Sequence, residues 1–286
     1  MEELQYFEDE FTQFLEDRKC SKRTVIGRIS IMRRFFRDYC VLNEETLNEF
    51  FEYLNDKCRP TTINANITSM NLYIRFIEQK YSIKLDNMYK KTVMIKKVQF
   101  LEDIATFEEY LCFMNQAQEK CKDKIYLACK IMATTGMRIH ELLNIRREHI
   151  EIGFIDFVGK GHKERRCFFT QNVQKEVLDI LDKHELKDKQ AYIISSRWDG
   201  KKQDWQQLRT LQKSISNFAV KECGFREELF HAHMFRHFFA KNFIKKYQNI
   251  ALLADLLGHS NLETTRIYLK YTSREQQEVV NEVVTW

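Results

Sequence analysis

Only one proline, Pro60, and eight glycines occur in this 286-residue chain. β-Sandwiches and β-barrels use these residues in their many turns, so their scarcity favours a mainly helical fold. Apolar residues make up 44% of the chain and charged residues 30%, which is typical of a globular protein with a buried core. The length predicts about two domains.

Residues 1–95 are predicted to form an all-α domain. Apolar residues recur every three or four positions, as in Leu4, Phe7 and Phe11, which is the spacing of an amphipathic helix. Ser21 and Pro60 are typical helix starts, and a further helix is expected over Glu44–Asp56. The prediction is therefore a bundle of helices.

Residues 96–104 are predicted to be a basic linker, because the surrounding stretch has lysines and no helical period. From residue 105 to 286 we expect an α+β domain. Ile152–Val158 and Arg165–Phe169 are expected to form a hairpin, with Tyr192–Ser195 as a third strand. Helices are expected at 106–119, 122–135, 138–147, 205–222, 233–246, 249–257, 261–271 and 274–284. The predicted fold class is mainly α with a small antiparallel β-sheet.

Net charge and cysteine content limit the kinds of partner and the cellular compartment that we expect for the protein. The net charge of +5 permits an anionic partner without requiring one. The eight cysteines form no CxxC pair, the N-terminal stretch is acidic, and no apolar run reaches the length of a membrane span. We therefore expect buried, reduced thiols in a cytoplasmic protein with no membrane association.

Two segments place reactive residue types beside helix ends. In TTGMRIHELL, Arg138 follows a glycine that ends a helix, and Glu141 lies one turn later. In LLGHSNLETTRIYLKY, His259 lies at a helix junction and is followed by Tyr268 and Tyr271. Taken singly, these residues are better explained as a surface salt bridge and as helix packing.

A third segment, HAHMFRH, is open to three interpretations. His233 and His237 have the i, i+4 spacing of zinc ligands, but Arg236 between them would repel a cation. His233 and Arg236 share a helix face and could instead both donate to a phosphate. The third interpretation is a core histidine whose ring is satisfied by the backbone.

Taken together, four motifs in order resemble the catalytic domain of the tyrosine recombinases, the phage integrase family. They are TTGMRIHELL, VGKGHKER, HAHMFRH and LLGHSNLETTRIYLKY. The resemblance covers residues 105–286, and residues 1–95 are similar to that family's helical core-binding domain. The compact two-domain arrangement resembles Xer-type recombinases and transposon resolvases.

The resemblance implies a site-specific recombinase that cleaves and rejoins DNA through a 3′-phosphotyrosyl intermediate, without metal, cofactor or ATP. Tyr268 matches the family nucleophile better than Tyr271, and Glu141 matches a residue that supports the site. The residues implied for catalysis are Arg138, Lys160, His233, Arg236, His259 and Tyr268.

These residue types suit that chemistry. A tyrosine stays attached to the phosphate during transfer, but it must lose a proton as it attacks. Arg138 and Arg236 are expected to bind the non-bridging oxygens, where negative charge develops. Lys160 is expected to protonate the departing 5′ oxygen. His233 is expected to assist proton loss from the tyrosine, and His259 to donate to a phosphate oxygen.

Family analogy also predicts the partners. The helices of 21–40 and 60–80 are expected on one side of double-stranded DNA, and the catalytic domain on the other. Residues expected to contact DNA are Lys22, Arg23, Arg28, Arg33, Arg37, Asn64, Arg75, Lys96 and Lys97, although a solvated helix face explains the basic run equally well. A homo-tetramer on two sites is implied, with residues 273–286 docked in a neighbouring protomer or packed on their own domain.

Three alternatives stay open. A type IB topoisomerase shares the chemistry but does not select a site. A metal-dependent nuclease would use His231, His233 and His237, and EDTA would abolish its activity. A non-catalytic architectural DNA-binding protein would have no reason to keep every catalytic residue type in place.

Overall fold

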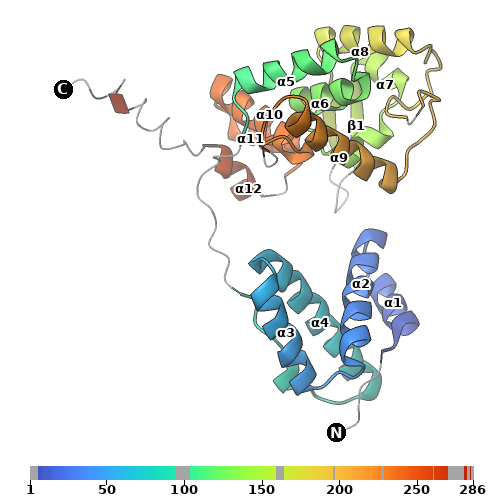
Figure 1. Ribbon diagram of the computed structural model, residues 1–286, viewed down its shortest axis with the longest axis vertical. Coiled ribbons are helices and arrows are strands. Elements are labelled where there is room, and N and C mark those ends of the chain that lie inside the picture. Colours follow the sequence, from blue (N-terminus) through green and yellow to red (C-terminus); the bar gives the residue numbers. More distant parts are fainter. Residues whose placement is uncertain are drawn as a thin grey trace. The chain divides into compact units, whose positions relative to one another are not determined.

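The computed structural model describes residues 6–93, 104–158, 164–195, 197–226, 229–259 and 261–269, with 280, 281 and 284. The chain divides into two compact units, residues 1–97 and 98–286. The described part is mainly helical with one small antiparallel sheet, which confirms the predicted fold class (Figure 1). No described helix has both the length and the apolar character needed to cross a membrane.

The first unit contains the expected helices. They are α1 (Glu8–Asp17), α2 (Lys22–Tyr39), α3 (Glu44–Lys57) and α4 (Pro60–Tyr81), followed by the 3₁₀ turn η1 (Asp86–Met88). Ser21 accepts a hydrogen bond from the Thr24 N–H at the start of α2, and Pro60 is the first residue of α4, as predicted. Tyr73 is fully buried at the centre of the core, where it meets the ring of Phe11 edge-on.

The second unit places helices around a β-hairpin. Its elements are α5 (Phe107–Glu119), α6 (Asp123–Thr135), η2 (Ile139–Asn144), α7 (Arg147–Ile152), β1 (Phe154–Val158), β2 (Glu164–Phe168), α8 (Gln171–Lys183), α9 (Trp205–Lys221), α10 (Ala232–Lys246), α11 (Ile250–Leu257), α12 (Glu263–Arg266) and η3 (Ile267–Leu269). The hairpin prediction is confirmed, with β1 and β2 paired antiparallel. Most of the helix predicted at 274–284 lies outside the described residues.

Two predictions about this unit were wrong. Tyr192–Ser195 is not a strand, because Tyr192 makes only an isolated bridge with Arg146. Its N–H donates to the Gly200 carbonyl, while the next N–H donates to Ile145, so no continuous ladder forms. The segment 138–147 is not one α-helix either: the 3₁₀ helix η2 ends at Asn144, the backbone of Ile145 is extended, and α7 begins at Arg147.

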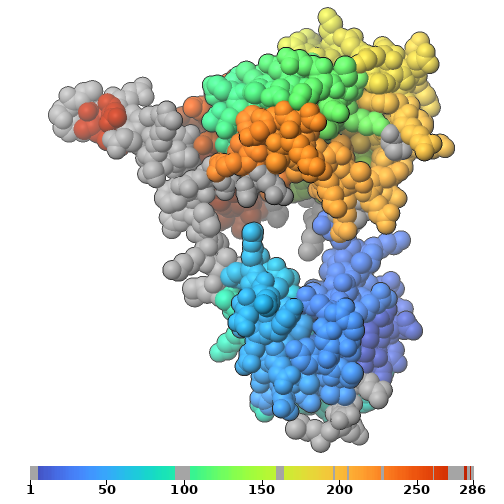
Figure 2. Space-filling model, viewed as in Figure 1, coloured from blue at the N-terminus to red at the C-terminus, as the bar shows by residue number. Residues whose placement is uncertain are grey.

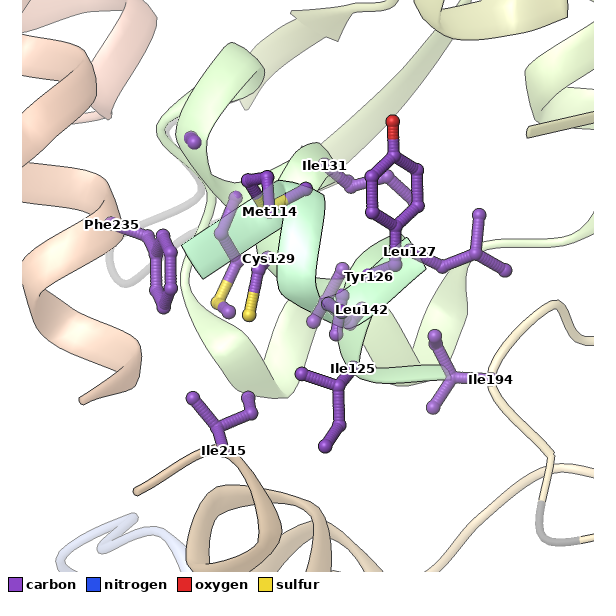
Figure 3. Packing of buried hydrophobic residues seen from close by; sticks show 14 of the residues in the cluster. Met114, Ile125, Tyr126, Leu127, Cys129, Ile131, Leu142, Ile194, Ile215 and Phe235 are labelled. Atoms are coloured by element: carbon purple, nitrogen blue, oxygen red, sulfur yellow. The ribbon is translucent and has the colours of Figure 1, made fainter. Parts of the chain in front are cut away.

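Packing between α6 and α10 organises the second unit. Met114 of α5, Cys129 and Ile131 of α6, and Phe235 of α10 contribute to one core cluster (Figure 3). Burial of such side chains is the main stabilising contribution to a fold of this size. This packing brings the end of α6 beside Arg236, the residue that follows Phe235.

The eight thiols are free, but the expectation that they are buried was wrong for several of them. Cys129 and Cys167 are buried, whereas Cys40, Cys112 and Cys121 are exposed. Small apolar size alone predicts burial for cysteine. Cys40 and Cys121 lie at helix ends, where the chain turns at the surface, and Cys112 lies on the exposed face of α5.

Candidate active site

Arg236 is almost completely buried, with 2% of its surface exposed. Its guanidinium donates to the carbonyl oxygens of Gly136 and Leu257, each at 2.6 Å. These carbonyls lie at the C-terminal ends of α6 and α11, where helices leave acceptors without partners. Burial, together with the charges of Arg138 and Arg165, lowers the pKa of Arg236 to about 10, so it remains charged at neutral pH.

Gly136 lets the end of α6 lie close enough to α10 for the hydrogen bond from Arg236 to form. Its φ is +65°, a left-handed conformation that favours glycine. An added Cβ would overlap the ring of Phe239 and lie 2.9 Å from a Leu257 methyl carbon. The glycine that ends the helix therefore also leaves room for the site.

Glu141 connects two further arginines. Its carboxylate accepts a hydrogen bond from the Arg138 backbone N–H at 2.6 Å and forms ion pairs with the guanidinium groups of Arg138 and Arg165. Burial of Glu141 raises the pKa of its carboxyl, but hydrogen bonding and charge from Arg165, followed by Arg138, lower it further than burial raises it. Glu141 is therefore ionised at neutral pH.

Arg165, which the sequence analysis did not select, lies at the centre of this arrangement. It is buried on β2, pairs with Glu141, and donates to the Leu256 carbonyl at 2.7 Å. It also occupies the space where Gly258 would carry a Cβ. A sequence signal existed: Arg165 and Cys167 share the buried face of β2, and a charged residue at such a position needs a buried partner.

The charges in this cluster do not balance. The three arginines, Arg138, Arg165 and Arg236, carry +3 against −1 from Glu141, which leaves a net +2. Arg138 keeps 39% of its side chain exposed. An excess of guanidinium groups, one of them accessible, is suited to binding an oxyanion such as a phosphate.

His259 lies beyond Gly258, at the end of α11. Its Nε2 accepts a hydrogen bond from Arg236 at 3.0 Å, because a guanidinium only donates. Its Nδ1 therefore carries the proton and donates to the Thr265 hydroxyl at 2.8 Å. Burial and the charges of Arg236, Arg138 and Arg165 lower the pKa of His259 to about 4, so the ring is neutral.

Tyr268 lies in η3 against α10, with 5% of its surface exposed. Its hydroxyl oxygen is 2.7 Å from Nδ1 of His237. Burial raises the pKa of the phenol, although Arg236 and Arg138 act in the opposite direction. His237 is the second functional candidate that the sequence analysis left out of the catalytic set; its interest there was as a zinc ligand.

The structure brings most of the predicted catalytic residues together. Arg236 binds the helix ends at Gly136 and Leu257 and contacts His259, and Arg138 lies two residues after Gly136. Tyr268 packs against the helix that carries Arg236. His233 is exposed on that helix. Partial desolvation by the surrounding protein, followed by the charge of Arg236, lowers the pKa of its imidazole. Lys160 lies outside the described residues.

The predicted DNA-contacting residues of the first unit lie on α2 and α4. The surface of α2 is visible, in blue, in Figure 2. Arg33 is bonded to Glu8 and Arg37 to Asp38. Asn64 bonds the backbone of Val93 through both ends of its amide. The other residues of the set are exposed or partly exposed, and Lys96 and Lys97 lie outside the described residues.

A groove of about 680 Å³ lies between α2 and α4. Arg33, Arg34 and Arg37 line one side, and the first residues of α4 line the other. Arg34 donates to the amide oxygen of Asn66 at 3.0 Å. Two of the predicted DNA-contacting residues, Arg33 and Arg37, thus line a concave surface in this unit.

A second cavity, of about 700 Å³, lies in the second unit away from these residues. Trp198 and His184, whose rings stack 3.9 Å apart, line it together with residues of α9. None of the predicted catalytic residues lines it. Among the described residues, no group of three or more His, Cys, Asp or Glu is arranged to hold a metal ion.

Comparisons with known proteins agree on one family. The family model described as the phage integrase family matches residues 104–275. The tyrosine recombinase XerC of Caldanaerobacter subterraneus is 25% identical over 254 residues, covering 85% of this chain and 70% of the relative. The TnP I resolvase of Bacillus thuringiensis is 25% identical over 297 residues, covering 96% and 97%.

Solved structures share the fold. A lambda integrase dimer bound to a COC′ core site has a TM-score of 0.71 and 18% identity, covering 93% of this chain and 95% of that one. A XerH recombinase complex with palindromic difH substrate has a TM-score of 0.65 and 21% identity, covering 96% and 84%.

Proposed function

Since this chain belongs to the phage integrase family and is a site-specific tyrosine recombinase, we propose that its Tyr268 attacks a DNA phosphodiester bound by Arg138 and Arg236. Enzymes of this class cleave and rejoin DNA through a covalent protein–DNA intermediate. The observation that carries the assignment is the convergence of Arg138, Arg236, His259 and Tyr268 from separate segments around an uncompensated positive charge.

The proposed reaction is an in-line phosphoryl transfer. The phenolic oxygen of Tyr268 forms a bond to phosphorus as the bond to the 5′ oxygen breaks, which leaves a 3′-phosphotyrosyl linkage. Negative charge on the non-bridging oxygens is stabilised by the fixed guanidinium groups. The linkage conserves the energy of the broken bond, so a 5′-hydroxyl can reverse the step without ATP.

Three further residues have proposed roles. Lys160, which lies between β1 and β2 in the sequence, is proposed to protonate the departing 5′ oxygen. His233 and His259 are proposed to contact the phosphate. His259 accepts from Arg236 through Nε2, so donation from that nitrogen requires a change of tautomer or protonation.

Phosphate contacts in the first unit are proposed for the exposed basic residues of α2. The groove between α2 and α4 supports this proposal, since its rim carries Arg33 and Arg37. Such contacts would contribute affinity for any DNA sequence, whereas base contacts would supply specificity.

The proposed assembly is a homo-tetramer on two DNA sites. A structural relative, lambda integrase, is a tetramer bound to a Holliday junction. Residues 273–286 carry four valines and Trp286, and we place this segment in the assembly as a contact with a neighbouring protomer. Deleting 274–286 should impair tetramer formation or strand exchange but preserve binding of one protomer, as measured by gel shift; unchanged tetramers would refute the docking proposal.

Covalent trapping tests the proposed nucleophile. The protein is incubated in EDTA with nicked duplexes from DNA flanking its own gene, and adducts that resist SDS are measured. We expect an adduct with wild type and with Tyr271→Phe, and none with Tyr268→Phe. Loss of the adduct in Tyr271→Phe alone would assign the nucleophile to Tyr271, and loss in EDTA would favour a metal-dependent reaction.

A further inference from the structure

We propose that His237 accepts the phenolic proton of Tyr268 when the tyrosine attacks DNA. The inference deepens the proposed function, because it assigns the proton acceptor for the nucleophile of that same site. From the family resemblance, His233 was expected to take this part. The contact with the Tyr268 hydroxyl in the described part of the chain comes from His237.

The geometry supports direct proton transfer. Nδ1 of His237 and the Tyr268 oxygen are 2.7 Å apart, within the range expected of a general base and its proton donor. The two ring centroids are 5.4 Å apart at 52°, so the rings meet by their polar edges and do not stack. Both residues are held by the packing of η3 on α10, with Tyr268 buried and His237 half-buried.

The surroundings keep His237 neutral before DNA binds. Burial is the main cause, and the groups that face the ring add to it: His233 and His231 on its own helix, then Arg236, then His259. Together they lower the pKa of His237 to about 4. At neutral pH the imidazole therefore has one nitrogen with a free lone pair. The proposal requires the tautomer in which this nitrogen is Nδ1, which then accepts the hydrogen bond from the Tyr268 hydroxyl.

The same surroundings explain why the tyrosine stays protonated at rest. The pKa of the phenol is raised and that of the imidazole is lowered, so proton transfer between them is unfavourable in the free protein. A phosphodiester bound by Arg138 and Arg236 adds negative charge beside the cluster, which favours the imidazolium and raises the pKa of His237. Substrate binding thereby makes His237 a stronger base.

The attack of Tyr268 exchanges one P–O bond for another. The Tyr268 oxygen bonds to phosphorus, its proton moves to Nδ1 of His237, and the 5′ oxygen leaves with the electron pair of the broken P–O bond and takes a proton from the general acid. In religation His237 returns its proton to the departing phenolic oxygen. No oxidant, metal or co-reactant is required.

Substitution by asparagine separates a base from a positioning residue. In His237→Asn the amide oxygen lies near the position of Nδ1 and still accepts a hydrogen bond, but it cannot take up a proton. We expect adduct formation on the nicked duplex to slow about 10²-fold or more, with little change in DNA affinity. His237→Ala provides a second variant. His233→Asn, one helical turn away, tests the residue to which the family resemblance gave this part, and we expect fluorotyrosine at position 268 not to restore its rate.

Fluorotyrosine at position 268 gives the decisive readout. Fluorine lowers the pKa of the phenol, so the nucleophile depends less on a base, and we expect it to restore part of the rate in His237→Asn and His237→Ala. A substrate with sulfur at the 5′ bridging position needs no proton on its leaving group, and we expect it to leave the His237 variants slow. A wild-type rate in His237→Asn, or a fluorotyrosine that restores nothing, would overturn the inference.

The proposed function and this inference fail in different ways. If wild type forms the Tyr268 adduct and His237→Asn forms it equally fast, only the role of His237 is wrong. If wild type forms no adduct at Tyr268, the proposed nucleophile is wrong and the inference fails with it.

Discussion

The arginines of α2 and those of the active site differ in their exposure to solvent and in how far along the sequence their partners lie. Arg37 pairs with the adjacent Asp38, and Arg33 pairs with Glu8 of the neighbouring helix; their side chains stay 71% and 65% exposed. Arg236 and Arg165 are buried and bind carbonyl oxygens 100 and 91 residues away in the sequence. The same residue type is thus used in two ways.

The difference follows from solvent screening. An exposed guanidinium is well hydrated, its ion pairs contribute little to stability, and it can exchange a carboxylate for a DNA phosphate at small cost. A buried guanidinium is held in one orientation because its hydrogen bonds cannot be replaced by water. Exposed arginines therefore suit binding along a DNA backbone, and buried ones suit holding a reacting phosphate.

The largest effect is expected for Arg236→Lys. An ammonium group keeps the charge but cannot reach the two carbonyls and His259 together, so the orientation of the site is lost. We expect the rate of covalent adduct formation to fall about 10²- to 10³-fold. Arg266→Lys is the matched control, since Arg266 is exposed and pairs only locally with Glu263. If the rate of adduct formation fell equally in both variants, buried and exposed arginines would not differ in their importance for the reaction.

A large effect on folding stability is expected from breaking the Arg165–Glu141 pair. Arg165→Met leaves the Glu141 carboxylate in a buried position with less compensation, which costs about 3–5 kcal/mol of unfolding free energy in comparable buried pairs. Chemical denaturation measures it. The double variant Arg165→Met/Glu141→Gln should recover part of the loss, and strict additivity of the two substitutions would show that the pair is not coupled.

The stability difference between wild type and Glu141→Gln should depend on pH. The folded-state pKa of Glu141 is lowered from its ordinary value of 4.5, so its stabilising contribution is fully present above that value. It is lost as pH falls from there through the folded-state pKa. Unfolding free energies of wild type and Glu141→Gln, measured across this range, should converge. A constant gap for Glu141→Gln would contradict the ionised pair.

The smallest effect is expected from Arg33→Gln and Arg37→Gln. Their exposed ion pairs should contribute little to stability. DNA binding should weaken on all sequences, and the slope of log K against log salt should decrease by about one for each lost phosphate contact. Titrations at several salt concentrations on specific and unrelated DNA measure this. A loss restricted to one base position would instead assign the residue to sequence recognition.

Local sequence patterns predicted the features that depend on neighbouring residues. The caps at Ser21 and Pro60, the helix ends at Gly136 and Gly258, and the β1–β2 hairpin are all present. Each depends on backbone conformation or hydrogen bonding within a few residues. The strand predicted at Tyr192–Ser195 failed because extended residues form a strand only when a partner pairs along their length.

Residues that act through distant partners were harder to predict. Arg165 pairs with a carboxylate 24 residues before it, and His237 contacts a tyrosine 31 residues after it. The alternation of residues along its strand places Arg165 on the buried face, and helical spacing places His237 on the same face as His233. Neither pattern identifies the partner on the other element, which is Glu141 for Arg165 and Tyr268 for His237. His237 was considered for zinc because spacing alone does not distinguish a metal ligand from a proton acceptor.

The sequence by itself therefore determined the helical fold class, the ends of most helices and the family of the chain, because these depend on short-range periodicity and on motifs in a set order. Only the tertiary structure decided which arginine is buried, which carboxylate holds two guanidinium groups, and which histidine contacts Tyr268. Those choices depend on how α6, α10, α11 and β2 pack, which brings together side chains that no local pattern relates.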